Sequence, residues 1–464
     1  MTGTDNIKGY FFVGIGGIGM SALAKYFIAG RYVVAGYDRT KSAITELLSE
    51  NGCEISYSDS VSSLPTLFRN PVFRKNVIIV YTPAIPADSE LLHYFRKNDF
   101  TIYKRSEVLG KLSESTDTIA VAGTHGKTTI STIISHLLKQ SHIDCSAFLG
   151  GISKNYNSNL LIGQSKYTVM EADEFDRSFH RLSPLIAVVS SLDADHLDIY
   201  GDHVTMIKAY NEFCAKVRPG GYLIVNKHIR EKIVAPPNVK CLTYGFDTTA
   251  DYYSFNIEAD KGFYRFDFNS QGVHFTDLHF GYPGKINIEN ATAAVAVALI
   301  CGLTEEEIRK ALLSFKGVQR RFDIRVNFPD LVYIDDYAHH PEEIKACISS
   351  VRDFYRGRRL TGIFQPHLFS RTRDHAEGFA AALDELDEII LLPIYPAREK
   401  PIEGITSEII FNKMNSANKR LVSKESVIGE LNTGNLDVLL TIGAGDIDTL
   451  VPGIEEKLNR ERNK

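Results

Sequence analysis

The residues best suited to chemistry lie in the run Gly123-Thr124-His125-Gly126-Lys127-Thr128-Thr129, which follows an apolar stretch and precedes a helical pattern. Glycines allow backbone N–H groups to close around phosphate oxygens, and the start of a helix adds a positive dipole. In such a loop, Lys127 would reach the β- and γ-phosphates and Thr128 would hold Mg²⁺. Val121 stands where the standard loop has its first glycine, and a simple glycine turn is the alternative interpretation. The run predicts a nucleoside triphosphate site.

A second glycine-rich segment lies near the N-terminus. Gly14, Gly16 and Gly19 have the G-x-G-x-x-G spacing of the dinucleotide-binding fingerprint, with Gly17 between them, and a following apolar run ends at Asp38. Such a loop selects a pyrophosphate at a helix N-terminus and not a nicotinamide in particular. NAD(P) is therefore one candidate ligand. A dehydrogenase would not need a second phosphate loop, however, so we expect another pyrophosphate ligand here.

Two clusters of acidic residues follow the phosphate loop. The first comes after a short apolar run and the second ends a long one; they comprise Glu171, Asp173, Glu174 and Asp176, and Asp193, Asp195, His196 and Asp198. Each cluster alone fits a solvated loop. Ligands of open parallel sheets bind at the carboxyl ends of the strands, and carboxylate oxygens suit the hard Mg²⁺ ion. Beside a phosphate loop, the clusters therefore predict a magnesium site.

Polar side chains also follow four expected strands in the last third of the chain. They are Asp335, Asp336, Tyr337, His339 and His340 after the first strand; Gln365, His367, Ser370, Arg371 and Arg373 after the second; Tyr395, Arg398, Glu399 and Glu403 after the third; and the turn 443–446 after the fourth. Ordinary polar loops explain any one group but not easily all four, so we expect a binding face. Just before them, the paired Arg320 and Arg321 could fork onto a phosphate.

Short β-branched runs alternate with helical patterns along the chain, which is typical of a parallel α/β architecture. The expected strands are 11–13, 32–36, 77–81, 118–122, 185–190, 222–225, 332–335, 360–364, 388–393 and 437–442. The stretch 251–280 breaks this alternation, because turn residues separate its short alternating pieces, as in antiparallel hairpins. Two helices are expected after it, the second opening with a capping box of Thr304 and Glu307.

The composition is that of an ordinary globular protein, with 464 residues, 44% of them hydrophobic and 23% charged. A net charge of −5 without a basic block argues against a nucleic-acid partner. The six cysteines form no C-x-x-C pair and are expected to be buried thiols in a reducing compartment. No apolar run approaches the roughly 20 residues that span a bilayer, and the N-terminus lacks signal-peptide features. We therefore expect a cytoplasmic protein without a membrane partner.

Ten short motifs together resemble those of the Mur ligase family. In chain order they are GIGGIGMSALA, GTHGKTT, EADEFDRSF, DADHLD, NIEN, QRRFD, DDYAHHP, QPHLFSRT, YPAREKPIEG and GAGDI, and they extend from Gly14 to Ile447. The resemblance implies an α/β protein of three domains, whose boundaries we place at 1–115, 116–318 and 319–464. These would be an N-terminal Rossmann-like domain for a UDP-sugar, a central P-loop ATPase-like domain with a parallel sheet and a small antiparallel segment, and a C-terminal Rossmann-like domain for an amino acid.

The resemblance also implies a reaction. Within the family, the motifs are most similar to those of members that join L-alanine to the lactyl carboxylate of UDP-N-acetylmuramate, in the synthesis of peptidoglycan precursors. ATP, with Mg²⁺, would convert the carboxylate to an acyl phosphate, and the amine of L-alanine would then attack it. Two alternatives are a recycling ligase that attaches a whole peptide to the same nucleotide sugar, and a non-enzymatic phosphate-binding or regulatory relative.

Roles for single residues follow from the same resemblance. Contacts with ATP are implied for Lys127 and the backbone of 123–129, for Asn287 and Asn290 at the adenine, for Arg320 or Arg321 at the γ-phosphate, and for Asp336 near the ribose. Thr128 is the implied ligand of the Mg²⁺ at the phosphates, and Glu171 and His196 are the implied ligands of a second Mg²⁺ near the acyl group. The nucleotide sugar would contact Gly14, Gly16, Gly17, Gly19, Asp38 and His125. The alanine pocket would comprise Tyr337, His367 and Arg371, with Arg371 binding the α-carboxylate bidentately. The expected catalytic residues among these are Lys127, His125, Glu171, His196, Arg320, Arg321 and Arg371.

Overall fold

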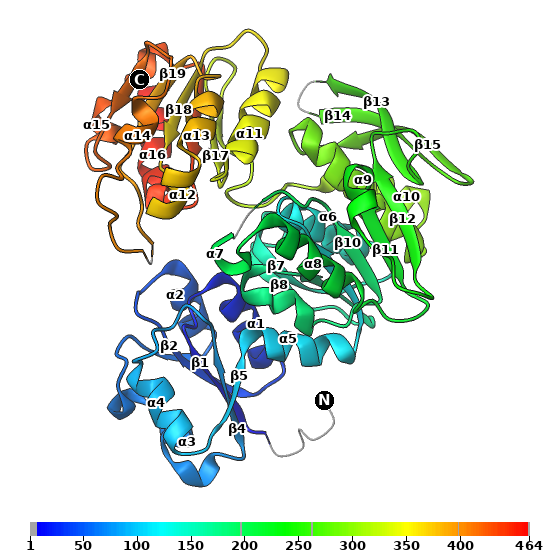
Figure 1. Cartoon of the computed structure of the whole chain (residues 1–464), viewed down its shortest axis with the longest axis vertical. Coiled ribbons are helices and arrows are strands. Elements are labelled where there is room, and N and C mark those ends of the chain that lie inside the picture. The colour runs from blue at the N-terminus through cyan, green and yellow to red at the C-terminus, as the bar shows by residue number, and fades with distance from the viewer. Residues whose placement is uncertain (1–6, 195–196, 261–262, 398, 463–464) are drawn as a thin grey trace. The chain divides into compact units, whose positions relative to one another are not determined.

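The computed structural model describes residues 7–194, 197–260, 263–397 and 399–462 (Figure 1). The chain divides into two units. The first comprises Met1–Phe255, Phe266–Leu278 and Glu289–Phe315, and the second comprises Asn256–Arg265, His279–Ile288 and Lys316–Lys464.

The N-terminal part of the first unit is a five-stranded parallel sheet in the order β3-β2-β1-β4-β5. Its strands are β1 (Gly9–Val13), β2 (Val33–Tyr37), β3 (Glu54–Ser56), β4 (Val77–Tyr81) and β5 (Thr101–Lys104), and its helices are α1 (Ile18–Ala29), α2 (Ala43–Glu50), α3 (Thr66–Arg69), α4 (Glu90–Lys97) and α5 (Arg105–Glu114). Side chains alternate across β1, so that Tyr10 stacks on Phe27 of α1 while Phe11 contacts Phe68 and Phe95 on the other face. This order confirms the expected Rossmann-like topology.

The central sheet has ten strands in the order β15-β14-β13-β12-β11-β10-β6-β9-β7-β8. Their bounds are β6 (Asp117–Ala122), β7 (Ser146–Ser153), β8 (Ser158–Leu161), β9 (Tyr167–Glu171), β10 (Ile186–Val189), β11 (Tyr222–Asn226), β12 (Lys240–Gly245), β13 (Tyr252–Asp260), β14 (Phe263–Ser270) and β15 (Val273–Phe280). The middle strands are parallel, and β6 lies between β9 and β10. The expected antiparallel segment is confirmed as β13–β15, whereas the antiparallel pair β7 and β8 was not expected from the sequence.

The helices of the central region are α6 (Lys127–Lys139), α7 (Leu197–Tyr200), α8 (His203–Cys214), α9 (Lys285–Ile300) and α10 (Glu305–Ser314). The start of α10 confirms the capping box, because Thr304 and Glu307 each accept a hydrogen bond from the backbone N–H of the other. Within the first unit, α1 packs on the edge of this sheet. Tyr26 contacts Phe148, and the Asn159 amide donates to the carbonyl of Ile18. The two sheets of the first unit therefore share one hydrophobic core.

The C-terminal sheet lies in the second unit and has the order β16-β17-β21-β18-β19-β20. Its strands are β16 (Asp323–Asn327), β17 (Val332–Asp336), β18 (Leu360–Phe364), β19 (Glu388–Leu391), β20 (Lys419–Leu421) and β21 (Val438–Ile442), and only β16 runs antiparallel to its neighbour. Its helices are α11 (Pro341–Phe354), α12 (Phe369–Asp374), α13 (Ala376–Leu383), α14 (Glu408–Phe411), α15 (Val427–Glu430) and α16 (Val451–Arg462). The parallel strands bring the ends of β17, β18, β19 and β21 to one edge, as expected.

All six cysteines are free thiols, and five of them are buried. Among the described residues, no helix is both long and apolar enough to cross a bilayer.

Candidate functional site

The phosphate loop lies where β6 ends and α6 begins, as the sequence predicts. Gly123 and Gly126 have φ angles of 137° and 82°, in the region that side chains disfavour. The first backbone bond of α6 runs from the N–H of Ile130 to the carbonyl of Gly126 (2.8 Å). The three preceding N–H groups, on Lys127–Thr129, therefore have no acceptor within the helix, which makes the helix start a ready site for an anion.

Val121, which replaces the first glycine of the standard loop, is a fully buried residue of β6. The loop itself begins only after Ala122, at the end of the strand. The departure from the standard pattern therefore affects the strand and leaves the turn with its two glycines intact.

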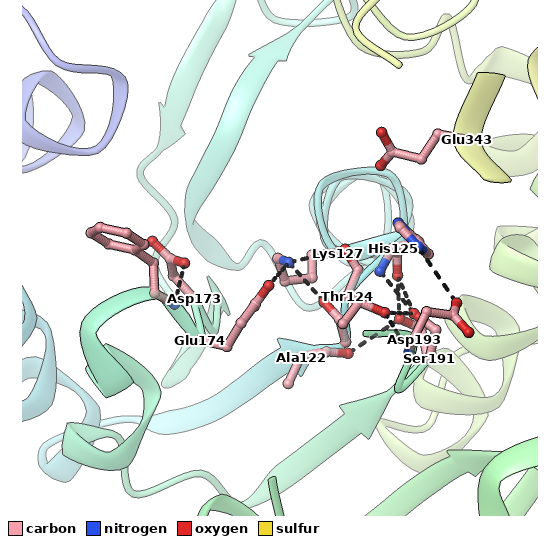
Figure 2. Close-up of polar contacts among 12 residues, drawn as sticks. Ala122, Thr124, His125, Lys127, Asp173, Glu174, Ser191, Asp193 and Glu343 are labelled. Carbon is pink, nitrogen blue, oxygen red and sulfur yellow. Dashed lines mark hydrogen bonds and ion pairs between the residues drawn. The ribbon is translucent and has the colours of Figure 1, made fainter. Parts of the chain in front are cut away.

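The ammonium group of Lys127 is bound entirely by groups of the protein (Figure 2). Its Nζ donates to Glu174 Oε1 (2.8 Å) and to the carbonyls of Gly123 (2.7 Å) and Thr124 (3.4 Å). The side chains of Lys127 and Glu174 are 15% and 1% exposed. Burial lowers the pKa of Lys127, but the carboxylates of Glu174, Glu171 and Asp173 outweigh burial and raise it. Lys127 is therefore charged, and Glu174 is its ion-pair partner. The sequence had placed Glu174 in a cluster expected to bind Mg²⁺.

His125, within the loop, is held beside the second acidic cluster. Its Nε2 lies 3.4 Å from Asp193 Oδ2, and both side chains are drawn in Figure 2. Asp193 follows β10, whose neighbour in the sheet is β6. The sheet thus brings the phosphate loop and the second cluster together, as the sequence predicts. His196, expected to bind metal, lies outside the described residues.

Glu171, the first expected carboxylate ligand, ends β9 next to β6. Its Oε2 accepts the N–H of Gly150 (3.1 Å), and a Cβ on Gly150 would overlap this carboxylate. Thr128 is buried at the first turn of α6. Both residues offer oxygen atoms, which are the ligands that Mg²⁺ prefers, so the donor set fits this ion. Among the residues with described positions, no group of three or more His, Cys, Asp or Glu side chains forms a ready metal site.

The two expected adenine contacts lie on α9, one helical turn apart. Asn290 is buried in the first unit, where a Cβ on Gly126 would come within 2.9 Å of its Oδ1. This places Asn290 beside the phosphate loop. Asn287, described with the second unit, donates from Nδ2 to the carbonyl of Pro283 (2.5 Å).

The N-terminal glycine loop lies between β1 and α1. The carboxylate of Asp38 accepts the N–H of Gly16 (2.7 Å) and that of Thr40 (3.1 Å), so it fixes the loop backbone. Gly14 has a φ of 90°. The first backbone bond of α1 is donated by Ser21 to Gly17 (2.8 Å), which leaves the preceding N–H groups as the anion-binding end of the helix.

A cation that the sequence did not single out lies at this helix start. Arg105 begins α5, and a Cβ on Gly19 would come within 2.8 Å of its Nη1. The other terminal nitrogen, Nη2, lies 3.5 Å from Asp173 Oδ2. Arg105 therefore places a positive charge beside the glycine loop and contacts the acidic cluster that follows β9.

In the second unit, both of the paired arginines lie against the ring of Tyr337. The guanidinium carbons of Arg320 and Arg321 lie 5.1 and 4.9 Å from the ring centroid. Arg320 also lies 3.4 Å from Asp335 and donates to the carbonyl of Gly443 (2.7 Å). Burial raises the pKa of Asp335 to about 6. Two arginines that were expected to bind a phosphate thus lie beside a tyrosine that was expected to line the alanine pocket.

Asp336 is buried, and its two oxygens accept the N–H groups of Phe322 (2.6 Å) and Ala338 (2.8 Å). Burial raises its pKa despite these bonds. These contacts hold the turn that carries the arginines. A contact of Asp336 with a ribose stays a prediction.

The expected alanine-binding residues belong to a chain of rings at the sheet edge. His339 contacts Tyr337 (5.2 Å between centroids) and His367 (6.1 Å), and His367 stacks on Tyr395 (5.8 Å). Burial, with the charges of Arg371 and Arg321, lowers the pKa of His339 to about 4 against the opposing carboxylate of Glu343. Arg371 thus acts on the same cluster. His339 and Tyr395 were noted in the sequence only as polar residues after strands.

The backbone at this cluster is strained. Leu368, between His367 and α12, has a φ of 68°, which is rare for a side chain of this kind. Its N–H donates to the carbonyl of Tyr395 (2.9 Å), which holds the conformation. Strain of this type concentrates at ligand sites.

Known families and structures resemble the chain over its whole length. Family models described as Mur ligase family, catalytic domain; Mur ligase middle domain; and Mur ligase, glutamate ligase domain match residues 10–116, 121–298 and 320–445. A relative from Parabacteroides distasonis, named UDP-N-acetylmuramate–L-alanine ligase, is 46% identical over 461 residues, covering 99% of each chain.

Two solved structures share the fold. The UDP-N-acetylmuramate-alanine ligase MurC of Thermotoga maritima superposes with a TM-score of 0.82 at 24% identity, covering 98% of this chain and 99% of the other. The MurF ligase of T. maritima, solved in complex with ADP, has a TM-score of 0.60 at 18% identity, covering 84% and 91%. With three family models in order and a relative of such identity over the full length, the chain belongs to the Mur ligase family.

Proposed function

We propose that this chain is an ATP-dependent ligase that joins L-alanine to the lactyl carboxylate of UDP-N-acetylmuramate. The observation that carries the proposal is the phosphate loop of the first unit, with a charged Lys127 at the start of α6 and acidic residues around it. The full-length relative that bears the name of this activity supports the choice of substrates.

The reaction begins with activation of a carboxylate, which is a poor electrophile. Phosphoryl transfer from ATP gives an acyl phosphate and ADP, and the amine of L-alanine then displaces phosphate through a tetrahedral state. The work of the protein in the first step is positioning and neutralisation of charge. The N–H groups of Lys127–Thr129 and the Lys127 ammonium would bind the triphosphate. Lys127 must leave Glu174 or share it in order to reach the phosphates.

Mg²⁺ would supply neutralisation of phosphate charge. Thr128 would hold the ion at the phosphates, and Glu171 and His196 would hold a second ion near the acyl group. Glu171 is already oriented by the N–H of Gly150, so the carboxylate needs no rearrangement of its own strand.

The nucleotide sugar would bind at the start of α1. There the pyrophosphate meets the free N–H groups of the first turn, and Arg105 adds a charge that can be shared between two phosphate oxygens. Asp38 would act by holding the glycine loop through Gly16, in addition to any contact with the ligand.

L-Alanine would bind at the ring cluster of the second unit. Arg371 would take the α-carboxylate, and Tyr337 and His367 would form the walls of a small pocket. Arg320 or Arg321 would serve the γ-phosphate. His339 stays neutral at neutral pH, since its pKa is about 4, so it adds no further positive charge to a site that must accept an amine.

The test is ADP release from ATP and Mg²⁺ with UDP-N-acetylmuramate, with the amino acid varied. L-Alanine is expected to drive ADP release, and L-alanyl-γ-D-glutamyl-meso-diaminopimelate is not. Preference for the tripeptide would favour the recycling ligase, and absence of ADP release with every acceptor would reject the ligase proposal.

A further inference from the structure

The two serines that follow β10 form a latch on the phosphate loop. The Ser191 Oγ accepts the N–H of His125 (2.8 Å) and lies 2.9 Å from Thr124 Oγ1, and the Ser191 carbonyl accepts the N–H of Thr124 (3.2 Å). Ser190 donates from Oγ to the carbonyl of His125. Figure 2 shows Ser191 with Thr124, His125 and Asp193. Backbone and side-chain groups of the loop are thus tied to the neighbouring strand.

The contacts of this latch also explain why position 123 is a glycine. A Cβ on Gly123 would overlap the hydroxyl of Ser190, so the loop approaches the end of β10 more closely than any side chain at 123 would permit. The approach brings the Thr124 hydroxyl within 3.0 Å of the N–H of Asp193, from which it accepts a hydrogen bond. Thr124 itself is only 6% exposed.

The latch uses two of the N–H groups of the loop, and three others belong to the first turn of α6. Those of Thr124 and His125 are bound to Ser191, and those of Lys127–Thr129 point out of the helix start. The N–H groups of Thr124 and His125 are therefore already bound within the protein, while a phosphate contact of the run 123–129 stays a prediction. The remaining N–H groups keep their direction only while the preceding residues stay fixed.

We propose that Ser191 is a positioning residue, which holds the phosphate loop in the shape that receives the nucleotide. The proposal rests on the proposed function, because it concerns the ATP site of that reaction. A hydroxyl has one donor and two acceptor positions. In this structure those of Ser191 are used by His125 and Thr124, so removal of the hydroxyl leaves two loop groups without their partner.

Ser191→Ala tests this proposal. Loss of two hydrogen bonds to the loop is expected to raise the dissociation constant of Mg²⁺–ADP and the KM for ATP about tenfold. The kcat should fall by less than about threefold, because Lys127 and its partner Glu174 are unchanged. The KM values for L-alanine and UDP-N-acetylmuramate should stay as they are. Ser191→Thr retains the hydroxyl and should restore nucleotide affinity.

Ser135→Ala is the matched control, since Ser135 is a buried serine of α6 whose hydroxyl donates only to the carbonyl of Ser131 (2.6 Å). It should leave nucleotide affinity unchanged. Calorimetry with Mg²⁺–ADP and the thermal unfolding midpoint of each ligand-free variant complete the experiment.

Equal affinity for Mg²⁺–ADP in Ser191→Ala and the unsubstituted protein would overturn the proposal. A fall in kcat with unchanged KM and dissociation constant would also overturn it, because the hydroxyl would then act on the chemical step. If the unsubstituted protein binds Mg²⁺–ADP but shows no ligase activity, the proposed function fails while the latch can still be tested by binding.

Discussion

Because Lys127 and Glu174 form a buried ion pair, the contribution of Lys127 to catalysis can be separated from its contribution to stability. Glu174 is 1% exposed, so Lys127→Met would leave a carboxylate in the protein interior without its cation. The double variant Lys127→Met/Glu174→Gln removes that charge as well. Comparison of these two variants with Glu174→Gln alone forms a double-mutant cycle.

The magnitudes follow from burial. Breaking a buried ion pair by removing one partner costs about 3–5 kcal/mol of the free energy of unfolding, largely because the other charge is left without compensation. The double variant should recover more than half of that loss, since a neutral amide is much less costly to bury. ADP release behaves differently. Loss of the ammonium at the transferring phosphoryl group should reduce its rate about a hundredfold or more in both variants that lack Lys127.

Urea unfolding and ADP release, measured on the same preparations, check the two effects. We expect the stability of the double variant to rise above that of Lys127→Met while both remain inactive. Recovery of ADP release to within about tenfold of the unsubstituted protein would refute the catalytic role of Lys127. Equal stability of the single and double variants would refute the energetic role assigned to the pair.

Three further predictions concern other parts of the chain. His136 lies between the hydroxyls of Tyr156 and Ser314 (3.0 Å each), and burial lowers its pKa from 6.5 to about 4, so the unfolded chain binds more protons in this range. The free energy of unfolding should therefore fall by up to about 3 kcal/mol as the pH is lowered from 6.5 to 4. Urea unfolding across that pH range should show a smaller loss for His136→Gln. Arg371→Lys should raise the KM for L-alanine about tenfold or more and leave the KM for ATP unchanged, because an ammonium lacks the planar fork; steady-state kinetics would show the reverse if Arg371 served the nucleotide. Arg105→Ala should weaken the binding of UDP-N-acetylmuramate about tenfold to a hundredfold, as measured by calorimetry. Unchanged affinity would show that Arg105 does not contact this ligand.

Much of the architecture could be predicted because it depends on local pattern. The expected strand 118–122 and the glycines after it correspond to β6 and the loop before α6, since an apolar run followed by Gly123 and Gly126 has few other conformations. The strands that the sequence did not reveal include short ones at sheet edges, such as β3 and β20, and the eight-residue β7 inside the central sheet. β7 contains Gly150, which weakens a strand pattern, and its conformation depends on packing against α1 and on the carboxylate of Glu171.

In the site too, some features follow from local sequence and others depend on the fold. The residue types that carry charge were recognised from the motifs, but their partners were not, because partners are set by the sheet and not by spacing along the chain. Glu174 pairs with Lys127 only because β9 neighbours β6. Ser191 and Arg105 have no distinctive sequence signal, since a serine after a strand and an arginine at a helix start are common. Only the three-dimensional arrangement distinguishes them.

In the proposed reaction, ATP activates the lactyl carboxylate for attack by L-alanine. The most direct measurement uses UDP-N-acetylmuramate with ¹⁸O in that carboxylate and follows the label by mass spectrometry. One ¹⁸O is expected in the inorganic phosphate released with ADP, and the amide product should retain the other when L-alanine is the acceptor. Unlabelled phosphate, or AMP and pyrophosphate in place of ADP and phosphate, would contradict the proposed reaction.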